Sequence, residues 1–434
     1  MKNTAQGALL VCGALVAILC YFIRQDQFIW IVLLFGLSFI LYIYAGSRVS
    51  TEGSWSTRYN LLIKIILIFS FPLASDDIYR FFWDGQVWLQ GFSAYQLKPS
   101  ELVLLHMQPF ETVYDKLNSK EYYSVYPPLL QLLFVSCALV SLKSVFLFSL
   151  FWKSILLIAD QLAIRYLKHL TPQLPQAVFW YAWNPLVLLE VFGNGHPEGL
   201  MICFLMMAFY YLKGDLIPRS AISMSIGTGI KLLPAFLFPF FMPYLGLKKG
   251  FKYWGAAVLL LLVLLFPVWP YFRNFYSSIQ LYFKTFEFNG SVYALWKTID
   301  YARLGYNNIA SIGQWMAACF LVVLTVLVVI QKKHHFPDMI RSCFVAWLTY
   351  LVLSTTVHPW YILPVLILGL LYGFFFPVVW SGMIILSYSW YDENLSSVTK
   401  YVLVTLEYLI VLIFMAIELI RRKSQSQMVG KSES

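Results

Sequence analysis

The chain has 434 residues, of which 60% are hydrophobic and 12% are charged, and its mean hydropathy is +0.70. A soluble domain carries about 25% charged residues, so the polar surface is too small to coat a soluble globule of this size. The net charge of +10 comes from basic residues in short loops. That is the positive-inside pattern of membrane proteins, and it gives no indication of a nucleic-acid partner.

Apolar runs recur from residue 7 to residue 420, each near the roughly 20 residues that a helix needs to cross a bilayer core. We therefore expect an all-α polytopic membrane protein with about 13 transmembrane helices, folded as a single integral membrane domain over residues 1–434. The first run, 7–23, lacks a small-residue cleavage site and indicates a span rather than a cleaved signal peptide. The six cysteines lie in apolar runs without CxxC spacing, which favours packing over disulfide or metal roles.

The basic clusters predict which loops face the cytoplasm. They are Arg48 with Arg58, Arg165 with Lys168, Lys248 with Lys249 and Lys252, residues 331–335, and residues 421–423. The loops expected outside are then 75–126, 193–198, 271–310, 355–360 and 392–394. The first of these is the longest polar stretch of the chain, and we expect it to be a structured loop.

Two segments need a special interpretation under this topology. Two full crossings between residue 75 and Arg165 would place Arg165 and Lys168 outside, so we expect residues 126–140 to form a partial or interfacial helix. Pro127 and Pro128 suit a helix that begins there. A second tight pair of short helices is predicted at 222–231 and 233–245, split around Lys231.

Adjacent acids open the long loop directly after an apolar run. Carboxylates at a membrane boundary are costly to desolvate and are often functional, which draws attention to Asp76 and Asp77. On a helix, Asp77, Arg80 and Asp84 share a face at spacings of three and four. An ionised, oriented carboxylate is what a general base requires. The alternative is a salt-bridged helix start with Ser75 or Asp76 as N-cap.

Other polar residues fall on the same predicted side, where proline interrupts the spans. His196 and Glu198 lie in the string GNGHPEG (193–199), His358 lies in TTVHPWY (355–361), and Lys231 lies three residues before Pro234. Each histidine taken alone has a structural interpretation near a helix end. Irregular backbone at membrane depth is tolerated only where protein or a water-filled cavity covers it, so their convergence predicts a cavity roofed by the long loop.

The strings DDIYRFFWDG (76–85), GFSAY (91–95) and YPPLL (126–130) resemble mannosyltransferases of the glycosyltransferase C superfamily that use polyprenyl-phosphate mannose. They are also similar to the catalytic subunit of GPI mannosyltransferase I. The strings WNPL (183–186), NGHPEG (194–199), GIKLLP (229–234) and HPWY (358–361) resemble further blocks of the bacterial members. The chain departs from the spaced D-x-D pattern because its two acids are adjacent, and it has Ala94 where the family often has proline.

The resemblance implies inverting transfer of a sugar, most often mannose, from a polyprenyl-phosphate donor to a hydroxyl acceptor, with a catalytic acid at Asp76 or Asp77. We favour Asp76, because laying Tyr79 and Asp84 on the GPI-type loop pattern puts Asp76 at the leading acid, and because Asp77 is spaced to pair with Arg80. The expected substrate-binding residues are Arg80, Asp84, Tyr126, His196, Glu198, Lys231, His358, Trp360 and Tyr361. Of these, Arg80, Lys231, His196 and His358 are the candidates to neutralise the leaving phosphate.

No cofactor is expected, although the acidic pair leaves a divalent metal open. The expected partners are the lipid-linked donor, a glycolipid or glycan acceptor, and membrane lipids. The expected location is the bacterial cytoplasmic membrane, with the site facing outward toward the cell envelope. The competing hypothesis is a polytopic transporter or flippase, which broken helices and the buried charges Lys231 and Glu190 also suit.

Overall fold

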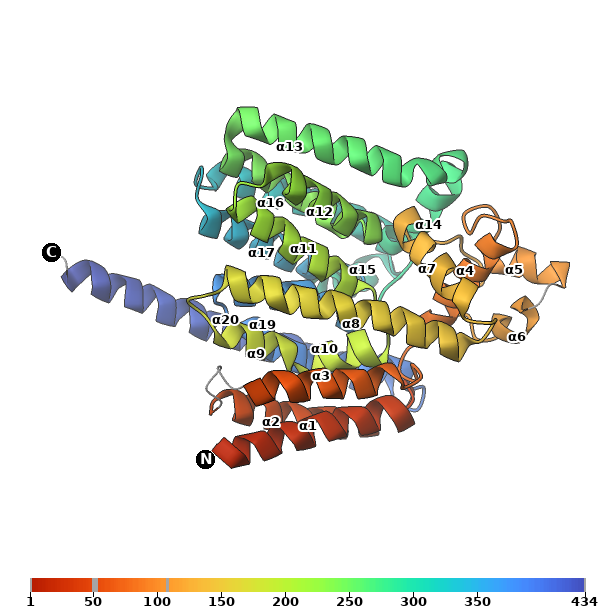
Figure 1. Ribbon diagram of the computed structural model, residues 1–434, viewed down its shortest axis with the longest axis horizontal. Helices are drawn as coiled ribbons and strands as arrows, with labels where there is room; N and C mark the ends of the chain where they lie inside the picture. Colours follow the sequence, from red (N-terminus) through yellow and green to blue (C-terminus); the bar gives the residue numbers. More distant parts are fainter. Residues whose placement is uncertain (1, 49–53, 107–108, 433–434) are drawn as a thin grey trace.

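The computed structural model describes residues 2–48, 54–106 and 109–432. Its regular elements are helices, and the long ones run side by side along one direction (Figure 1). Six helical segments of the described chain are long and apolar enough to cross a membrane. Many large apolar side chains point outward, among them Trp30, Leu262 and Val322, each more than half exposed. Such a surface suits lipid rather than water, and the predicted all-α polytopic class is confirmed.

The long helices are apolar runs in which proline occurs only in the first turn, and one of them contains a break. That break lies at Gly246, which has φ +74° inside α13. The long helices are α1 (Lys2–Phe22), α2 (Phe28–Gly46), α3 (Ser54–Ile68), α8 (Val145–Leu170), α11 (Glu198–Lys213), α12 (Ile217–Ile230), α13 (Phe241–Leu265), α16 (Ile309–Ile330), α17 (Phe336–Val352) and α20 (Ser397–Ser432).

Other apolar segments are chains of short helices. Proline often stands in their first turn, where its missing N–H costs nothing and where it ends the preceding element. These elements are α9 (Gln176–Ala182), α10 (Pro185–Val187) and the π-helical turn η2 (Leu188–Gly193); η3 (Leu233–Phe240); η5 (Pro359–Ile362) and α18 (Leu363–Tyr372); and α19 (Phe376–Met383) and η6 (Ile384–Tyr391).

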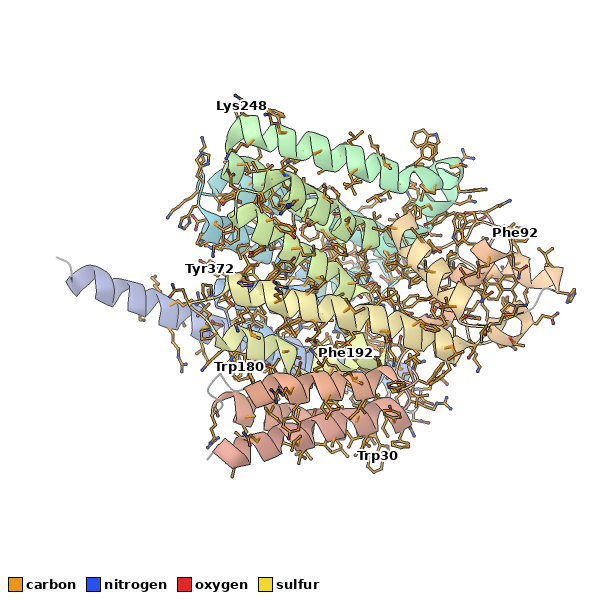
Figure 2. All side chains as sticks on the ribbon, in the orientation of Figure 1. Trp30, Phe92, Trp180, Phe192, Lys248 and Tyr372 are labelled. Atoms are coloured by element: carbon orange, nitrogen blue, oxygen red, sulfur yellow. The ribbon has the colours of Figure 1, made fainter. Side chains whose placement is uncertain are left out.

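The bundle has two distinct ends. At the basic end, His334 contacts the backbone of Tyr244 beside the Gly246 break, and Arg422 contacts the carbonyl of Gly373. Figure 2 shows Lys248 and Tyr372 toward this end and Phe92 toward the other. The loop end carries α4 (Asp77–Leu89), α5 (Pro99–Leu102), η1 (Val103–Leu105), α6 (Phe110–Tyr114), α7 (Pro128–Val140), η4 (Phe266–Tyr271), α14 (Phe272–Lys284) and α15 (Ser291–Leu304).

Helix α7 is the segment predicted not to cross the membrane. It has 13 residues, which at 1.5 Å per residue gives about 20 Å, less than the roughly 30 Å of a bilayer core. It packs against α4 at the loop end (Figure 1). A Cβ built on Gly85 of α4 would lie 2.6 Å from the carbonyl oxygen of Phe134, so the two helices approach closely there. The length of α7 agrees with the prediction of a partial helix.

The predicted break around Lys231 is confirmed. Helix α12 ends at Ile230, and Lys231 leaves the helix with an extended backbone before η3 begins at Leu233. The chain therefore presents Lys231 from an interruption between two apolar helices. Such an interruption inside a bundle needs protein or a cavity around it.

Candidate functional site

Arg80 of α4 holds the long loop together. Its Nε donates to Asp84 Oδ1 at 2.8 Å, and its Nη1 donates to the backbone oxygens of Ser119 at 2.8 Å and Tyr122 at 3.1 Å. Asp84 is fully buried and also accepts from Ser124 and Gln131. The predicted shared face exists, but Arg80 makes its ion pair with Asp84, and the predicted pairing with Asp77 is wrong. Both spacings suit a helix, and residues 119–124 fold back onto the Asp84 side.

The two adjacent aspartates stand at the N-terminus of α4 in different surroundings. Asp76 Oδ2 accepts from Gln25 Nε2 at 2.6 Å, and partial burial raises the pKa of Asp76 above its usual value. Asp77 Oδ1 accepts from Asn118 at 2.9 Å. The Asp77 N–H donates to the Ser75 hydroxyl at 3.3 Å, while Asp76 occupies the cap position without a side-chain cap bond. Asp77 is therefore not held by Arg80 and remains part of the site.

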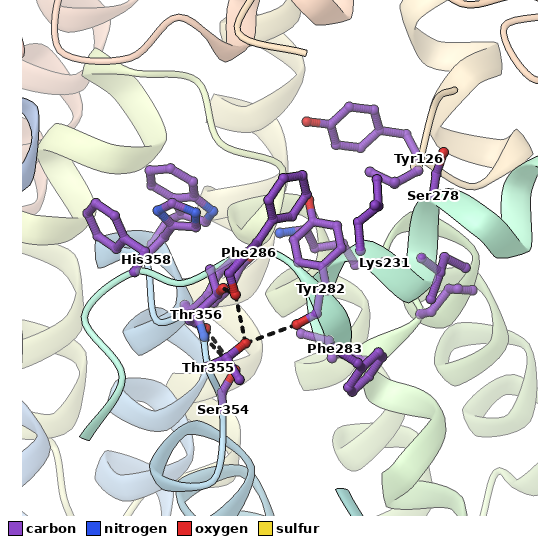
Figure 3. Close-up of a pocket in the computed structure, with 18 of the residues that line it drawn as sticks. Tyr126, Lys231, Ser278, Tyr282, Phe283, Phe286, Ser354, Thr355, Thr356 and His358 are labelled. Carbon is purple, nitrogen blue, oxygen red and sulfur yellow. Dashed lines mark hydrogen bonds between the residues drawn. The ribbon is translucent and has the colours of Figure 1, made fainter. Parts of the chain in front are cut away.

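A cavity of about 1020 Å³ brings most of the predicted site residues together. Those that line it are Asp76, Asp77, Arg80, Tyr126, His196, Lys231, His358, Trp360 and Tyr361. Asp84 lies behind Arg80, and Glu198 lies behind Lys231, outside the lining. Figure 3 shows Lys231 and Tyr126 on one side of this space and His358 on the other.

His196 lies at the centre of a chain of acidic groups. Its Nδ1 is 3.7 Å from Asp77 Oδ2, and its Nε2 is 3.3 Å from Glu190 Oε2. The ring is fully buried and stacks on Trp360, with centroids 3.6 Å apart. The sequence suggested His196 as a partner for phosphate, whereas the structure places it between two carboxylates.

Lys231 is paired with Glu198, and its ammonium lies 4.8 Å from the ring centre of Tyr361. Glu198 is buried at the first turn of α11. Lys231 retains some exposure to the cavity. The predicted proximity of Lys231 to the acidic pair is confirmed to the extent that both line one cavity.

His358 precedes η5 and stacks on Trp360, with parallel rings 4.5 Å apart. Burial, together with the neighbouring His196 and Lys231, lowers the pKa of His358 to about 3. His358 is therefore neutral near pH 7 in this structure. It can offer a hydrogen bond to a ligand, but it does not supply the positive charge that the sequence suggested.

Two backbone segments form one wall of the cavity. Residues 286–289 meet residues 354–356, where Thr355 Oγ1 donates to Tyr282 O at 3.0 Å and Phe286 O at 2.9 Å (Figure 3). Thr356 also pairs with Phe288 and Asn289 through isolated β-bridges. The 271–310 region was predicted only as an outside loop, so its part in the cavity was missed.

The cavity has one markedly apolar part. Lys231 is followed along the same wall by Leu232, Leu233, Ala235 and Phe236, and these face lining residues of α14 and α16. The lining residues of this part from those two helices are Ile279, Leu281, Phe283, Gly313, Ala317, Phe320 and Leu321, beside Ser278 and Tyr282. We call this part the apolar lobe. A single space therefore joins paired acids, a lysine and a lipid-like surface.

Several lining or supporting residues escaped the sequence analysis as site residues. Gln25, Asn118, Tyr282 and Tyr391 line the cavity, and Glu190 supports His196. Glu190 carried a signal, since a carboxylate within an apolar run is costly unless it has a role. The others are ordinary polar or aromatic residues in segments far apart in sequence.

Comparison with known protein families agrees with this geometry. Residues 5–246 match the family described as alpha-(1->6)-mannopyranosyltransferase, N-terminal domain. That range covers more than half of the 434 residues and contains the acidic pair, His196 and Lys231. No curated protein matches the chain. The chain belongs to the alpha-(1->6)-mannopyranosyltransferase family, and it is a membrane glycosyltransferase.

Proposed function

We propose that this enzyme transfers a mannosyl unit from polyprenyl-phosphate mannose to a hydroxyl of a glycan or glycolipid, at the non-cytoplasmic face of the membrane. The observation that carries the proposal is the single cavity in which the apolar lobe adjoins Lys231 and which the acidic pair also lines. A donor with an isoprenoid tail, a phosphate and a sugar has the same three chemistries. The placement outside rests on the separation of the site from the basic end, which the positive-inside rule assigns to the cytoplasm.

The family's description names an alpha-(1->6) linkage, which suggests the 6-hydroxyl of a sugar as the acceptor. An inverting enzyme that makes an α-linkage requires a donor in which the sugar is β-linked to phosphate. The acceptor oxygen forms a bond to the anomeric carbon, the bond from that carbon to the phosphate oxygen breaks, and the acceptor proton goes to a carboxylate. The lipid phosphate leaves with the bonding electrons.

We assign the base to Asp77 rather than to Asp76. The geometric reason for preferring Asp76 was an Asp77–Arg80 pair, and Arg80 is engaged by Asp84 instead. Asp77 faces the cavity between Asn118 and His196. Asp76 is held by Gln25, and the burial that raises its pKa disfavours its charged form. Lys231 and Arg80 provide positive charge at the cavity wall, and His358 provides a neutral hydrogen-bonding group.

The direct test compares Asp76→Asn with Asp77→Asn. Loss of a general base lowers the rate by about 10² to 10⁴, so Asp77→Asn should lower transfer by that range, while Asp76→Asn should cost less. The measurement is mannose transfer from synthetic polyprenyl-phosphate mannose to a mannose-containing acceptor by purified protein in detergent. Thermal unfolding of each variant shows whether it is folded.

The outcomes of this comparison separate the hypotheses. A dead, folded Asp76→Asn beside an active Asp77→Asn would return the base to Asp76. Full activity of both variants would refute a carboxylate base at this position. Absence of any transfer by the wild-type protein would refute the donor, and only in that case would the transporter hypothesis regain support, because the family is one of mannosyltransferases.

The apolar lobe gives a separate prediction about the donor. Ala317 lines the lobe, so Ala317→Trp should fill it and raise the KM for the polyprenyl donor by about tenfold or more. Exclusion of two methylene groups already costs about that much, at roughly 0.8 kcal/mol for each group. Ala318→Trp is the matched control, because Ala318 is exposed on the same helix and does not line the cavity. Equal KM values for the two variants would argue against a tail in this lobe.

A further inference from the structure

Glu190 is a buried carboxylate to which the mechanism above gives no role. It has no exposed surface and lies in η2, a π-helical turn that ends a broken apolar segment. Its Oε1 accepts from the Tyr388 hydroxyl at 2.8 Å, and its Oε2 accepts from Asn194 at 3.0 Å. π-Helical turns often mark functional sites, and a carboxylate at membrane depth is costly unless something requires it.

The third partner of Glu190 is His196. Glu190 Oε2 lies 3.3 Å from His196 Nε2, and the other ring nitrogen lies 3.7 Å from Asp77 Oδ2. The imidazole therefore connects a carboxylate that faces the cavity to one that does not. Neither ring nitrogen makes a hydrogen bond to the described residues, so the two carboxylates contact the imidazole at ion-pair distances only. The imidazole ring of His196 is therefore the link between the carboxylates of Glu190 and Asp77.

The backbone around His196 fixes the position of the ring. The His196 N–H donates to the Glu190 carbonyl at 2.9 Å, and Trp152 Nε1 donates to Gly195 O at 2.6 Å. Gly195 has φ +79°, a conformation that favours glycine, so this turn depends on the glycine directly before His196. Trp360 covers one face of the imidazole. With the ring fixed by turn and stack, the carboxylate of Glu190 lies at one ring nitrogen and that of Asp77 at the other.

We propose that Glu190 is a positioning residue that acts through His196 on the reactive carboxylate Asp77. The inference rests on the proposed function, because Asp77 must act on the acceptor for its orientation to matter. Glu190 orients the N–H of His196, and His196 directs its other nitrogen at Asp77.

The test is Glu190→Gln, which keeps the shape of the side chain and removes its charge. Catalytic contacts that are long in a resting site tighten to hydrogen bonds during the reaction, and hydrogen bonds to charged groups have a strength that corresponds to roughly a tenfold to hundredfold effect, so kcat should fall by that factor. The KM for the polyprenyl donor and the thermal unfolding temperature should stay near the wild-type values. Glu190→Asp retains the charge and should recover part of kcat. A structural role alone would predict loss of stability instead of a selective loss of kcat.

A double-mutant cycle shows whether the effect passes through His196. In a His196→Gln background, Glu190→Gln should cost much less than it does alone, because the connection is already broken. Asp160→Asn is the matched control: Asp160 is equally buried and pairs with Lys64 away from the cavity. It should lower the unfolding temperature without a selective change in kcat per folded molecule.

Several outcomes would overturn the inference. One is a wild-type kcat for Glu190→Gln. Another is an equal fall in kcat from that change with and without His196→Gln. A third is a loss of activity that the loss of folded protein fully explains. If Glu190→Gln does not fold, Glu190→Asp takes its place, and a wild-type kcat for that folded variant would equally refute it. Wild-type protein without transfer activity would instead refute the proposed function.

Discussion

The two adjacent aspartates, Asp76 and Asp77, are neighbours in sequence but contact different partners. Asp76 is held by Gln25 at the end of the first helical hairpin, whereas Asp77 faces Asn118 and His196. Their presence at the membrane boundary was predictable from the sequence, and so was the shared face of Arg80 and Asp84. The partners were not predictable, because helix spacing allows Arg80 to pair in either direction, and the choice depends on residues 119–124 that return from a distance.

Asp76 should also give the protein a specific pH dependence. Because burial raises its pKa, the folded protein keeps this proton to higher pH than the unfolded chain does. The contribution of Asp76 to stability is therefore greatest at low pH and falls as pH rises through the raised pKa. Asp76→Asn should raise the unfolding temperature at pH 7, since asparagine can still accept the Gln25 hydrogen bond without a buried charge.

The gain from Asp76→Asn should shrink when unfolding is measured at a pH below the raised pKa. The control is Asp115→Asn, whose side chain is 94% exposed and whose effect should be small at both pH values. A lower unfolding temperature for Asp76→Asn at pH 7 would show that the charge of Asp76 stabilises the fold, contrary to this expectation.

At the scale of elements, the interruptions between helices place the site. The short α7 and the break between α12 and η3 were predictable, because loop charges fix the number of crossings and proline marks the interruptions. The contribution of residues 286–289 and 354–356 was not. Their pairing joins segments about 70 residues apart, and neither segment carries a local signal for it. The π-helical turn was equally hidden, since its apolar sequence also suits an ordinary helix.

The contact between α4 and α7 should be sensitive to a single methyl group. Gly85→Ala places a Cβ 2.6 Å from a backbone oxygen of α7, and backbone cannot move aside as a flexible side chain can. Overpacking of this kind costs about 1 to 3 kcal/mol. Because α4 carries both aspartates, transfer activity should fall together with stability, as measured by thermal unfolding and by the mannose assay.

The control for this contact is Gly255→Ala in α13. A Cβ at Gly255 meets nothing within 4 Å, and alanine is favoured over glycine in a helix by up to about 1 kcal/mol. That change should therefore leave stability unchanged or raise it. Equal stability of Gly85→Ala and the wild type would mean that the two helices separate without cost.

At the scale of the whole molecule, the two ends of the bundle differ in charge and in function. The basic clusters at residues 331–335 and 421–423 lie opposite the cavity, its roof and α4 to α7. The division of the chain into these two sets of loops was predictable from charge alone. The side of the membrane that each end faces remains a prediction of the positive-inside rule.

Single cysteines test that orientation. Asp115→Cys at the loop end and Ser424→Cys near the C-terminus are both at exposed positions. In intact cells, a membrane-impermeant maleimide should label the cysteine at 115 and leave the one at 424 unlabelled until the membrane is opened. Native Cys319 is exposed on α16, so both variants belong in a Cys319→Ser background. The reverse labelling pattern would place the site in the cytoplasm.

The pairing of Lys231 with Glu198 has a consequence for turnover. In the proposed reaction, the donor phosphate is a diester with one negative charge before transfer and a monoester that carries up to two afterwards. A lysine without a partner would hold the more charged product more tightly, and the spent carrier would accumulate on the enzyme. Because Glu198 already neutralises Lys231, the lysine can accept a developing charge without retaining the product. The same ion pair that lies at the cavity wall thus favours exchange of used carrier for fresh donor.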